Sequence, residues 1–178
     1  RPRGRRGERR QVMEGYRELM GEACAQLPKG AFLMVEGNPM TIGWAQFGVV
    51  WSKPVCTVFV RHSRHTHALL EKSGRFTVSV PAPGTMEEAL AYCGSHSGRD
   101  GDKRAACGLS LLAPRAGGAA PLAGCAMHFE CRVLCRAACD PALLEAGLRA
   151  HYYGGNQATA DGDPHTLYFG EILAAYRA

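Results

Sequence analysis

The chain contains many short runs of β-branched and aromatic residues, without the regular alternation of strand and helix that builds a parallel sheet. Only small helical segments lie between these runs. An open antiparallel sheet would leave unpaired edges, whereas closure removes them. The sequence therefore predicts a mainly β protein, a closed or partly closed β-barrel with peripheral helices. The expected strands are residues 31–35, 41–50, 54–61, 76–80, 125–135 and 165–176.

The expected helices are placed by apolar periodicity and by residues that favour helix ends. Apolar side chains recur at helical spacing over residues 12–24, and the sequence Pro-Lys-Gly at 28–30 ends that segment. Further short helices are expected after Ser63, at residues 85–92 and at residues 142–150. Ser63 and Thr85 are the expected N-caps, and Gly74 is the expected C-terminal glycine of the helix after Ser63. A turn is expected at Asn38 and Pro39.

The net charge of +5 is confined to the first ten residues, which hold six arginines and one glutamate. The remaining 168 residues carry 15 basic and 15 acidic side chains, so this part is formally neutral. We therefore expect residues 1–10 to be a disordered basic tail and residues 11–178 to be one domain. The neutral domain lacks the basic footprint of a nucleic-acid-binding protein.

The eight cysteines indicate free thiols rather than a disulfide framework, because the chain is long and rich in core residues. Several of them lie in apolar, strand-like runs, where a buried thiol behaves as a small hydrophobe. The sequence therefore favours a reducing compartment, and the protein is expected to be cytoplasmic. No apolar run is long enough for a membrane-spanning helix, and the basic tail lacks the apolar stretch of a signal peptide.

Three segments combine polar residues and glycines in a way that indicates a ligand site. The first, residues 38–45, is a turn feeding a strand with small residues around Trp44. Such a segment lets a flat ligand approach the backbone while the indole covers its face. A hairpin with a core tryptophan would produce the same pattern.

The second segment, residues 61–67, lies between a strand and the start of a helix. The hydroxyls of Ser63 and Thr66, the charges of Arg61 and Arg64, and the free amides of the helix start together suit a phosphate group. An ordinary capped helix with solvated arginines is the alternative. Two histidines in this segment, His65 and His67, cannot share a helix face, which argues against a paired-histidine metal site.

The third segment, residues 93–103, has three glycines and short side chains, so it can form a folded loop. Arg99 and Lys103 at its end are able to close over an anionic ligand. Read without a ligand, the segment is a surface loop with an exposed Asp–Arg pair, which contributes little to stability.

Taken together and in this order, the three segments resemble the flavin reductase-like family with the FMN-binding split β-barrel, in particular its flavoredoxin-like branch. The resemblance is carried by Asn-x-Met-Thr-x-x-Trp at 38–44, a serine, arginine and threonine around a helix start at 61–66, Phe-Thr-Val-x-Val-Pro at 76–81, and Cys-Gly-x-x-Ser-Gly-Arg-Asp-x-Asp-Lys at 93–103. It covers residues 28–176. The chain departs from the family at His62 and His65, where relatives carry proline and tyrosine.

This resemblance implies a bound FMN and assigns residues to its parts. The ring and ribityl chain would be lined from the first segment, the phosphate would be held by the second, and the loop of the third would approach the flavin. A phenylalanine of the last strand would pack near the ring, from either subunit of a dimer. The implied cofactor-binding residues are Asn38, Met40, Thr41, Trp44, Arg61, Ser63, Arg64, Thr66, Arg99, Asp100, Lys103 and Phe169.

The resemblance further implies an oxidoreductase that passes electrons through FMN from NADH, NADPH or a redox partner protein. The flavin supplies the redox chemistry, so no side chain is assigned as a catalytic acid or base. No Gly-x-Gly-x-x-Gly follows a strand, so a nicotinamide would stack directly on the flavin as a transient donor. The family also implies a homodimer, with neither nucleic acid nor membrane as a partner.

Two other classes of function remain open at this stage. A non-catalytic module on the same fold would hold flavin or haem without turnover. A metal protein would use Cys93, His96 and Cys107, or Cys131, Cys135 and Cys139. The first set lacks the paired spacing of zinc motifs, and four-residue steps along a strand place the second set roughly 13 Å apart, so no metal is expected.

Overall fold

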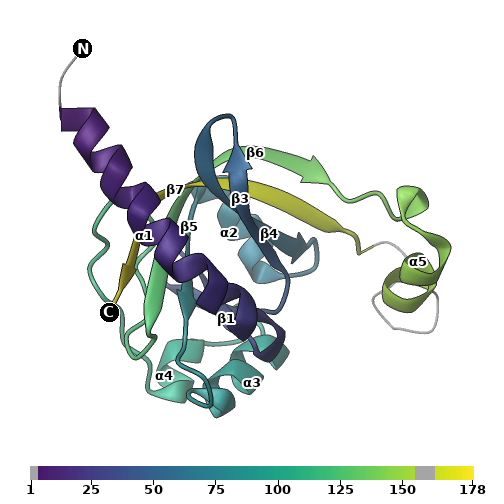
Figure 1. Ribbon diagram of the computed structural model, residues 1–178. Coiled ribbons are helices and arrows are strands. Elements are labelled where there is room, and N and C mark those ends of the chain that lie inside the picture. Colours follow the sequence, from purple (N-terminus) through teal and green to yellow (C-terminus); the bar gives the residue numbers. More distant parts are fainter. Residues whose placement is uncertain (1–3, 155–162) are drawn as a thin grey trace.

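A computed structural model describes residues 4–154 and 163–178 of the chain (Figure 1). Its strands are β1 (Ala31–Val35), β2 (Asn38–Ile42), β3 (Ala45–Val50), β4 (Lys53–Arg61), β5 (Arg75–Val80), β6 (Met127–Ala138) and β7 (His165–Arg177). The helices are α1 (Gly4–Gln26), α2 (His65–Ser73), α3 (Glu87–Ser95), α4 (Lys103–Cys107) and α5 (Ala146–Tyr153), with 3-10 turns η1 (Leu27–Lys29) and η2 (Pro141–Leu143).

The seven strands form one antiparallel sheet in the order β2-β1-β5-β6-β7-β4-β3. Strands β2 and β3 follow each other in sequence but lie at opposite edges. In a flat sheet these edges would be about 29 Å apart, whereas two residues, Gly43 and Trp44, span at most about 11 Å between the strands. The sheet must therefore curl until its edges meet, which makes a barrel that is split between β2 and β3. The mainly β prediction, with a split barrel, is confirmed.

The barrel interior is filled by apolar side chains from every strand together with one face of α1. Figure 1 shows α1 lying across the sheet, and its buried residues Tyr16, Leu19 and Ala23 belong to the main core. Gly15 is required where α1 crosses β7, because a Cβ there would collide with the carbonyl oxygen of Ala175. A helix that packs this closely on the sheet fixes the position of the chain that leads into β1.

Helix α1 begins earlier than the sequence predicts. The expected helix at residues 12–24 is confirmed, but the helix extends back to Gly4, so disorder was the wrong prediction for residues 4–10. The reason is cooperative propagation: once residues 12–26 are anchored by packing, each residue added to the helix gains a hydrogen bond without a new nucleation cost. Arginine and glutamate are also good helix formers. An Arg10–Glu14 ion pair lies on this exposed turn. Residues 1–3 lie outside the described residues.

Local predictions at turns and helix caps are partly wrong. Asn38 and Pro39 begin β2 rather than forming a turn, and the expected strand at 41–50 is broken at Gly43. Ser63 and Thr85 do not cap helices: the N-caps of α2 and α3 are Arg64 and Met86. Gly74 is the left-handed C-cap of α2, with φ of 61°, as predicted.

The helices are placed unequally around the barrel. Figure 1 shows α3 and α4 side by side at one end of the molecule, whereas α5 lies at the far end of the long β6 and β7 strands. Helix α3 packs against β2, so the segment after it is brought to the split. Within the described residues, no helix is long and apolar enough to cross a membrane.

Candidate functional site

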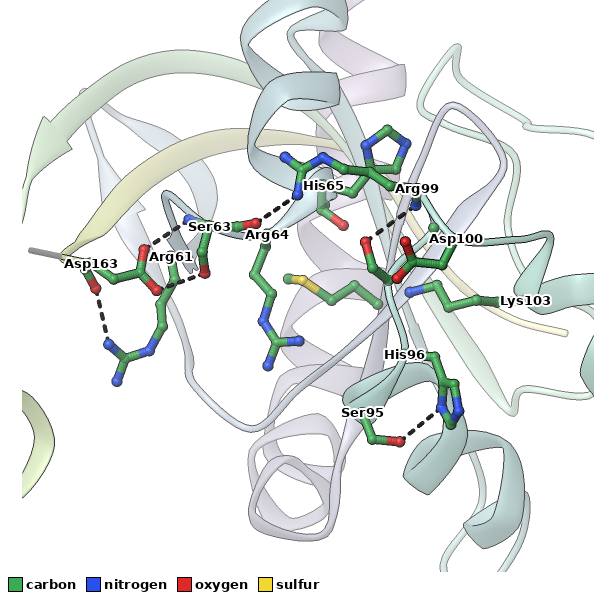
Figure 2. A pocket seen from close by; sticks show the side chains of 14 residues that line it. Arg61, Ser63, Arg64, His65, Ser95, His96, Arg99, Asp100, Lys103 and Asp163 are labelled. Carbon is green, nitrogen blue, oxygen red and sulfur yellow. Dashed lines mark hydrogen bonds between the residues drawn. The ribbon is translucent and has the colours of Figure 1, made fainter. Parts of the chain in front are cut away.

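Two cavities adjoin at the split of the barrel, and Met40, Arg61 and Arg64 line both. The larger, of about 420 Å³, is polar, and we call it the polar cavity (Figure 2). Its other lining residues are Ser63, His65, Thr66, Ser95, His96, Ser97, Gly98, Arg99, Asp100, Lys103 and Asp163. The smaller, of about 200 Å³, is the aromatic cavity, and its other lining residues are Thr41, Ile42, Gly43, Trp44, Phe59, Tyr152 and His165.

The aromatic cavity is built where the chain crosses the split. Trp44 is 39% exposed, and its ring meets the edge of Tyr152 at 4.9 Å and lies 5.0 Å from His165, between ring centroids. Thr41 donates its hydroxyl to the carbonyl of Leu90 at 2.6 Å, which ties β2 to α3. A half-exposed indole, held by aromatic neighbours beside exposed backbone, offers a flat apolar surface to a ligand.

The start of α2 forms one wall of the polar cavity. The Asn38 amide donates to the hydroxyl of the buried Thr66 at 3.0 Å, so β2 and α2 are held together at this wall. Because Arg64 is the N-cap, the unpaired amides of the first turn and the positive end of the helix dipole lie next to the cavity. This arrangement favours an anionic group.

Asp163, which the sequence analysis missed, occupies the same wall. Its carboxylate accepts from the Ser63 amide at 2.7 Å and from the Ser63 hydroxyl at 2.6 Å. The guanidinium of Arg61 donates to the carbonyls of Asp163 at 2.9 Å and of Tyr152 at 3.2 Å. These contacts join residues about a hundred positions apart in sequence, and the only signal in the sequence is an acidic residue shortly before the last strand.

The opposite wall is the segment 94–102, which we call the cavity loop. Figure 2 shows it facing the start of α2, and the Arg99 guanidinium crosses to donate to the Ser63 carbonyl at 2.8 Å. In the other direction, Arg64 donates to the carbonyl of Gly94 at 3.0 Å. A Cβ at Gly98 would collide with Asn38 and His65, so a glycine is needed for the loop to dock this closely.

Lys103 and His165 are two buried basic groups of the site. Lys103 is 4% exposed, and its ammonium donates to the carbonyl of Cys93 at 3.3 Å. Burial holds the pKa of Lys103 below its usual value. Burial, helped by the charge of Arg61, lowers the pKa of His165 to about 4, so its ring is neutral near pH 7. The Tyr153 hydroxyl is hydrogen-bonded to Nδ1 of that ring.

The structure brings together most of the residues named from sequence. Asn38 reaches the wall through Thr66, whereas Phe169 lines neither cavity. Phe169 instead lies 6.2 Å from Trp51, between ring centroids, in the first half of β7. The predicted residues that line one or both cavities are Met40, Thr41, Trp44, Arg61, Ser63, Arg64, Thr66, Arg99, Asp100 and Lys103.

The described part of the chain contains no group of three histidine, cysteine or acidic side chains that could hold a metal ion. His96, considered from sequence as a ligand, stacks on Tyr92 with ring centroids 3.8 Å apart and shares hydrogen bonds with Ser95. His96 is the C-cap of α3, and its ring packs on the last turn of that helix.

Comparison with known proteins gives one family and a consistent set of folds. Residues 25–178 match the family model described as Flavin reductase like domain. Flavoredoxin from Methanosarcina acetivorans is 25% identical, with a TM-score of 0.61 over 84% of this chain and 68% of that one. The FMN-binding protein of Thermus thermophilus is 24% identical, with a TM-score of 0.61 over 84% and 71%. The NADH:FAD oxidoreductase SgcE6 of Streptomyces globisporus C-1027 is 23% identical, with a TM-score of 0.60 over 84% and 75%.

Proposed function

The chain belongs to the flavin reductase-like family, and this family and the similar solved structures support a flavin-related redox function. We propose that the chain binds FMN at the split of the barrel and passes electrons through it. Electrons would come from NADH, NADPH or a redox partner protein. The proposal follows the family, and the site of this chain supports it independently.

The observation that carries the proposal is the pairing of the two cavities. The polar cavity collects three arginines, Arg61, Arg64 and Arg99, beside hydroxyls and a helix N-terminus, with Lys103 buried in its wall. This donor set fits a phosphate dianion. The aromatic cavity, joined to it through shared lining residues, offers the face of Trp44. A ligand with a phosphate at one end and a flat ring at the other matches both.

Individual side chains then have distinct roles toward FMN. Arg64, Thr66 and the α2 amides would hold the phosphate, and Trp44 with Met40 would contact the ring. The cavity loop would exclude water from one side, with Lys103 as a buried positive charge. When bound, the flavin supplies the hydride and electron chemistry, and the chain positions it and sets its electronic environment.

The first test is a spectrum of the purified protein before and after addition of FMN. We expect the visible bands of bound oxidised flavin, either at once or on titration. Arg64→Met should weaken FMN binding by about tenfold to a hundredfold, because one charge-assisted contact to phosphate is lost. Arg17→Met, at an exposed position on α1, is the control and should bind as the original protein does. A protein that neither carries FMN nor perturbs its spectrum would refute the proposal.

Steady-state oxidation of NADH and NADPH separates a reductase from the alternative, a flavin- or haem-binding module without turnover. We expect FMN-dependent oxidation of one nicotinamide. If neither is oxidised while FMN is bound and a redox protein reduces it, the chain is a flavoredoxin-like carrier. If nothing reduces the bound flavin, the binding-module function replaces the present one.

We also propose that two copies of the chain associate. The hairpin of β3 and β4 exposes Val49, near the end of β3, by 61% and Trp51, in its turn, by 58%. Trp51 and Ser52 both adopt positive φ. Bulky exposed residues in such a turn are unusual and suit a covered surface. Trp51→Glu should convert a dimer to a monomer in sedimentation analysis, whereas Arg17→Met should not. A monomer in the unmodified protein would refute this proposal.

A further inference from the structure

Two cysteines flank the cavity loop at its base. Cys93 lies in the last turns of α3, and Cys107 is the last residue of α4. The two helices pack against each other, as Figure 1 shows, and the chain between the cysteines carries Arg99, Asp100 and Lys103 of the polar cavity. Any bond between these cysteines therefore closes a ring that contains the loop.

The two thiols are neighbours. The Cys107 thiol lies close enough to the Cys93 thiol to raise its pKa. The hydrogen bond from Lys103 to the Cys93 carbonyl holds the start of α4 against the end of α3. Both cysteines are free in the structure.

The environments of the two thiols differ, and this difference decides which thiol reacts first. Cys93 is fully buried among apolar side chains, whereas Cys107 is partly exposed. Burial is the main reason that the pKa of the Cys93 thiol rises to about 11. A reagent in solution therefore meets Cys107 first, and Cys93 reacts from inside the protein.

We propose that Cys93 and Cys107 form a redox-active dithiol, which small-molecule disulfides oxidise to an intramolecular disulfide that closes the cavity loop. In the first step, the Cys107 thiolate attacks one sulfur of the small disulfide, and one thiolate leaves. In the second, the Cys93 sulfur, losing its proton, attacks the Cys107 sulfur of the mixed disulfide and releases the second thiol. Two protein thiols are oxidised and one small disulfide is reduced to two thiols.

A second pair of cysteines in the barrel provides an internal contrast. The thiols of Cys56 and Cys131 also neighbour each other, but both residues are 0% exposed in the main core. A reagent cannot reach them without unfolding. They should stay reduced under conditions that oxidise the Cys93–Cys107 pair.

Closing the ring has a direct effect on the polar cavity. A cross-link at the base of residues 94–102 removes conformations in which α4 separates from α3. The loop, which makes one wall of the cavity, then opens less often. The inference concerns the chain without any cofactor, so it holds whether or not FMN binds.

The test is peptide mapping by mass spectrometry after equilibration of the flavin-free protein in glutathione buffers of increasing oxidised fraction. We expect a Cys93–Cys107 linked peptide, absent in Cys107→Ser and retained in the control Cys135→Ser, an exposed cysteine on β6. In Cys93→Ala, which lacks the second thiol, Cys107 should accumulate as the mixed disulfide with glutathione.

Hydrogen exchange of the cavity loop gives the second readout. Amides of residues 94–102 should exchange more slowly in the oxidised protein, on the order of threefold or more, and at the original rate in oxidised Cys107→Ser. A mixed disulfide at Cys107 as the end product in the unmodified protein would overturn the dithiol. A Cys93–Cys107 linked peptide without slower amide exchange in residues 94–102 would show that the disulfide does not restrict the cavity loop.

Discussion

A single carboxylate, that of Asp163, takes both donors of Ser63 that a phosphate oxygen would use. A bound phosphate must either displace the Asp163 carboxylate or bind close to its negative charge, which repels the phosphate. Asp163→Asn keeps an acceptor for Ser63 but removes the charge. We expect FMN to bind about fivefold more tightly, corresponding to about 1 kcal/mol of relieved repulsion.

Fluorescence titration of FMN measures this change. Asp140→Asn is the matched control, because Asp140 caps η2 away from both cavities. Weaker binding in Asp163→Asn would mean that the carboxylate supports the site by orienting Ser63.

The charge of Lys103 should act on the bound flavin rather than on its phosphate. Reduction of flavin adds negative charge, and a buried ammonium near the ring stabilises that charge more strongly than an exposed one. Lys103→Met should therefore lower the FMN midpoint potential by about 20–40 mV, the equivalent of about 1–2 kcal/mol for two electrons. Spectroelectrochemical titration tests this, with the exposed Lys72→Met as control. An unchanged potential would remove Lys103 from this role.

At the scale of elements, the docking of the cavity loop depends on one glycine. Gly98→Ala places a methyl group against Asn38 and His65, so the loop must lift from β2 and α2. We expect a loss of about 1–3 kcal/mol in unfolding free energy, measured in urea, together with weaker FMN binding. Gly101→Ala is a matched control three residues away, because a Cβ there meets nothing within 4 Å. Equal behaviour of the two variants would show that the loop adapts without cost.

The elements themselves could be predicted where the pattern is local. The strands at 31–35 and 76–80 and the C-cap at Gly74 follow from apolar runs and from the preference of glycine for positive φ. The caps at Ser63 and Thr85 were wrong because distant or alternative partners take these hydroxyls: the Asp163 carboxylate for Ser63 and the Ala82 carbonyl for Thr85. Cap preferences describe a helix end in isolation and contain no information about such partners.

For the whole molecule, the sequence was enough to predict the fold class, a β-barrel. It was enough to predict only some of the residues that form the site. The residues of the three contiguous segments around Trp44, Arg64 and Arg99 could be found because the members of each segment are close in sequence. Tyr152, Asp163 and His165 reach the same cavities through β7 and the end of α5, and only the strand order brings them there. Nothing in their local sequence specifies that order.

Stability of the whole molecule should fall in mild acid because two buried histidines are kept neutral. Burial first, then the charges of Arg115 and Arg61 respectively, lower the pKa values of His128 and His165 to about 4. Unfolded histidine titrates near 6.5, so between these values the unfolded chain binds more protons. Their contribution to stability is complete above about pH 6.5 and decreases as the pH falls toward 4.

Urea unfolding at pH 7.5 and pH 5 should therefore differ by about 2–4 kcal/mol, with lower stability at pH 5. His128→Leu should remove roughly half of this difference, because the Nε2 atom of His128 is buried without a hydrogen-bond partner and protonation there is costly. His151→Leu, at an exposed position, should leave the difference intact. The same pH dependence in His128→Leu would contradict the assignment.

The two-residue crossing at Gly43 and Trp44 has a further consequence for how the barrel responds to proteolysis. A single cut there would leave every strand pairing in place, since β2 pairs only with β1 and β3 only with β4. Nothing covalent would then hold the two edges together, and the curl of the sheet would depend on side-chain packing and on contacts such as the Asn38–Thr66 hydrogen bond. Both cavities lie at these edges, so a nicked molecule would keep its secondary structure while the seam that forms its ligand site opened.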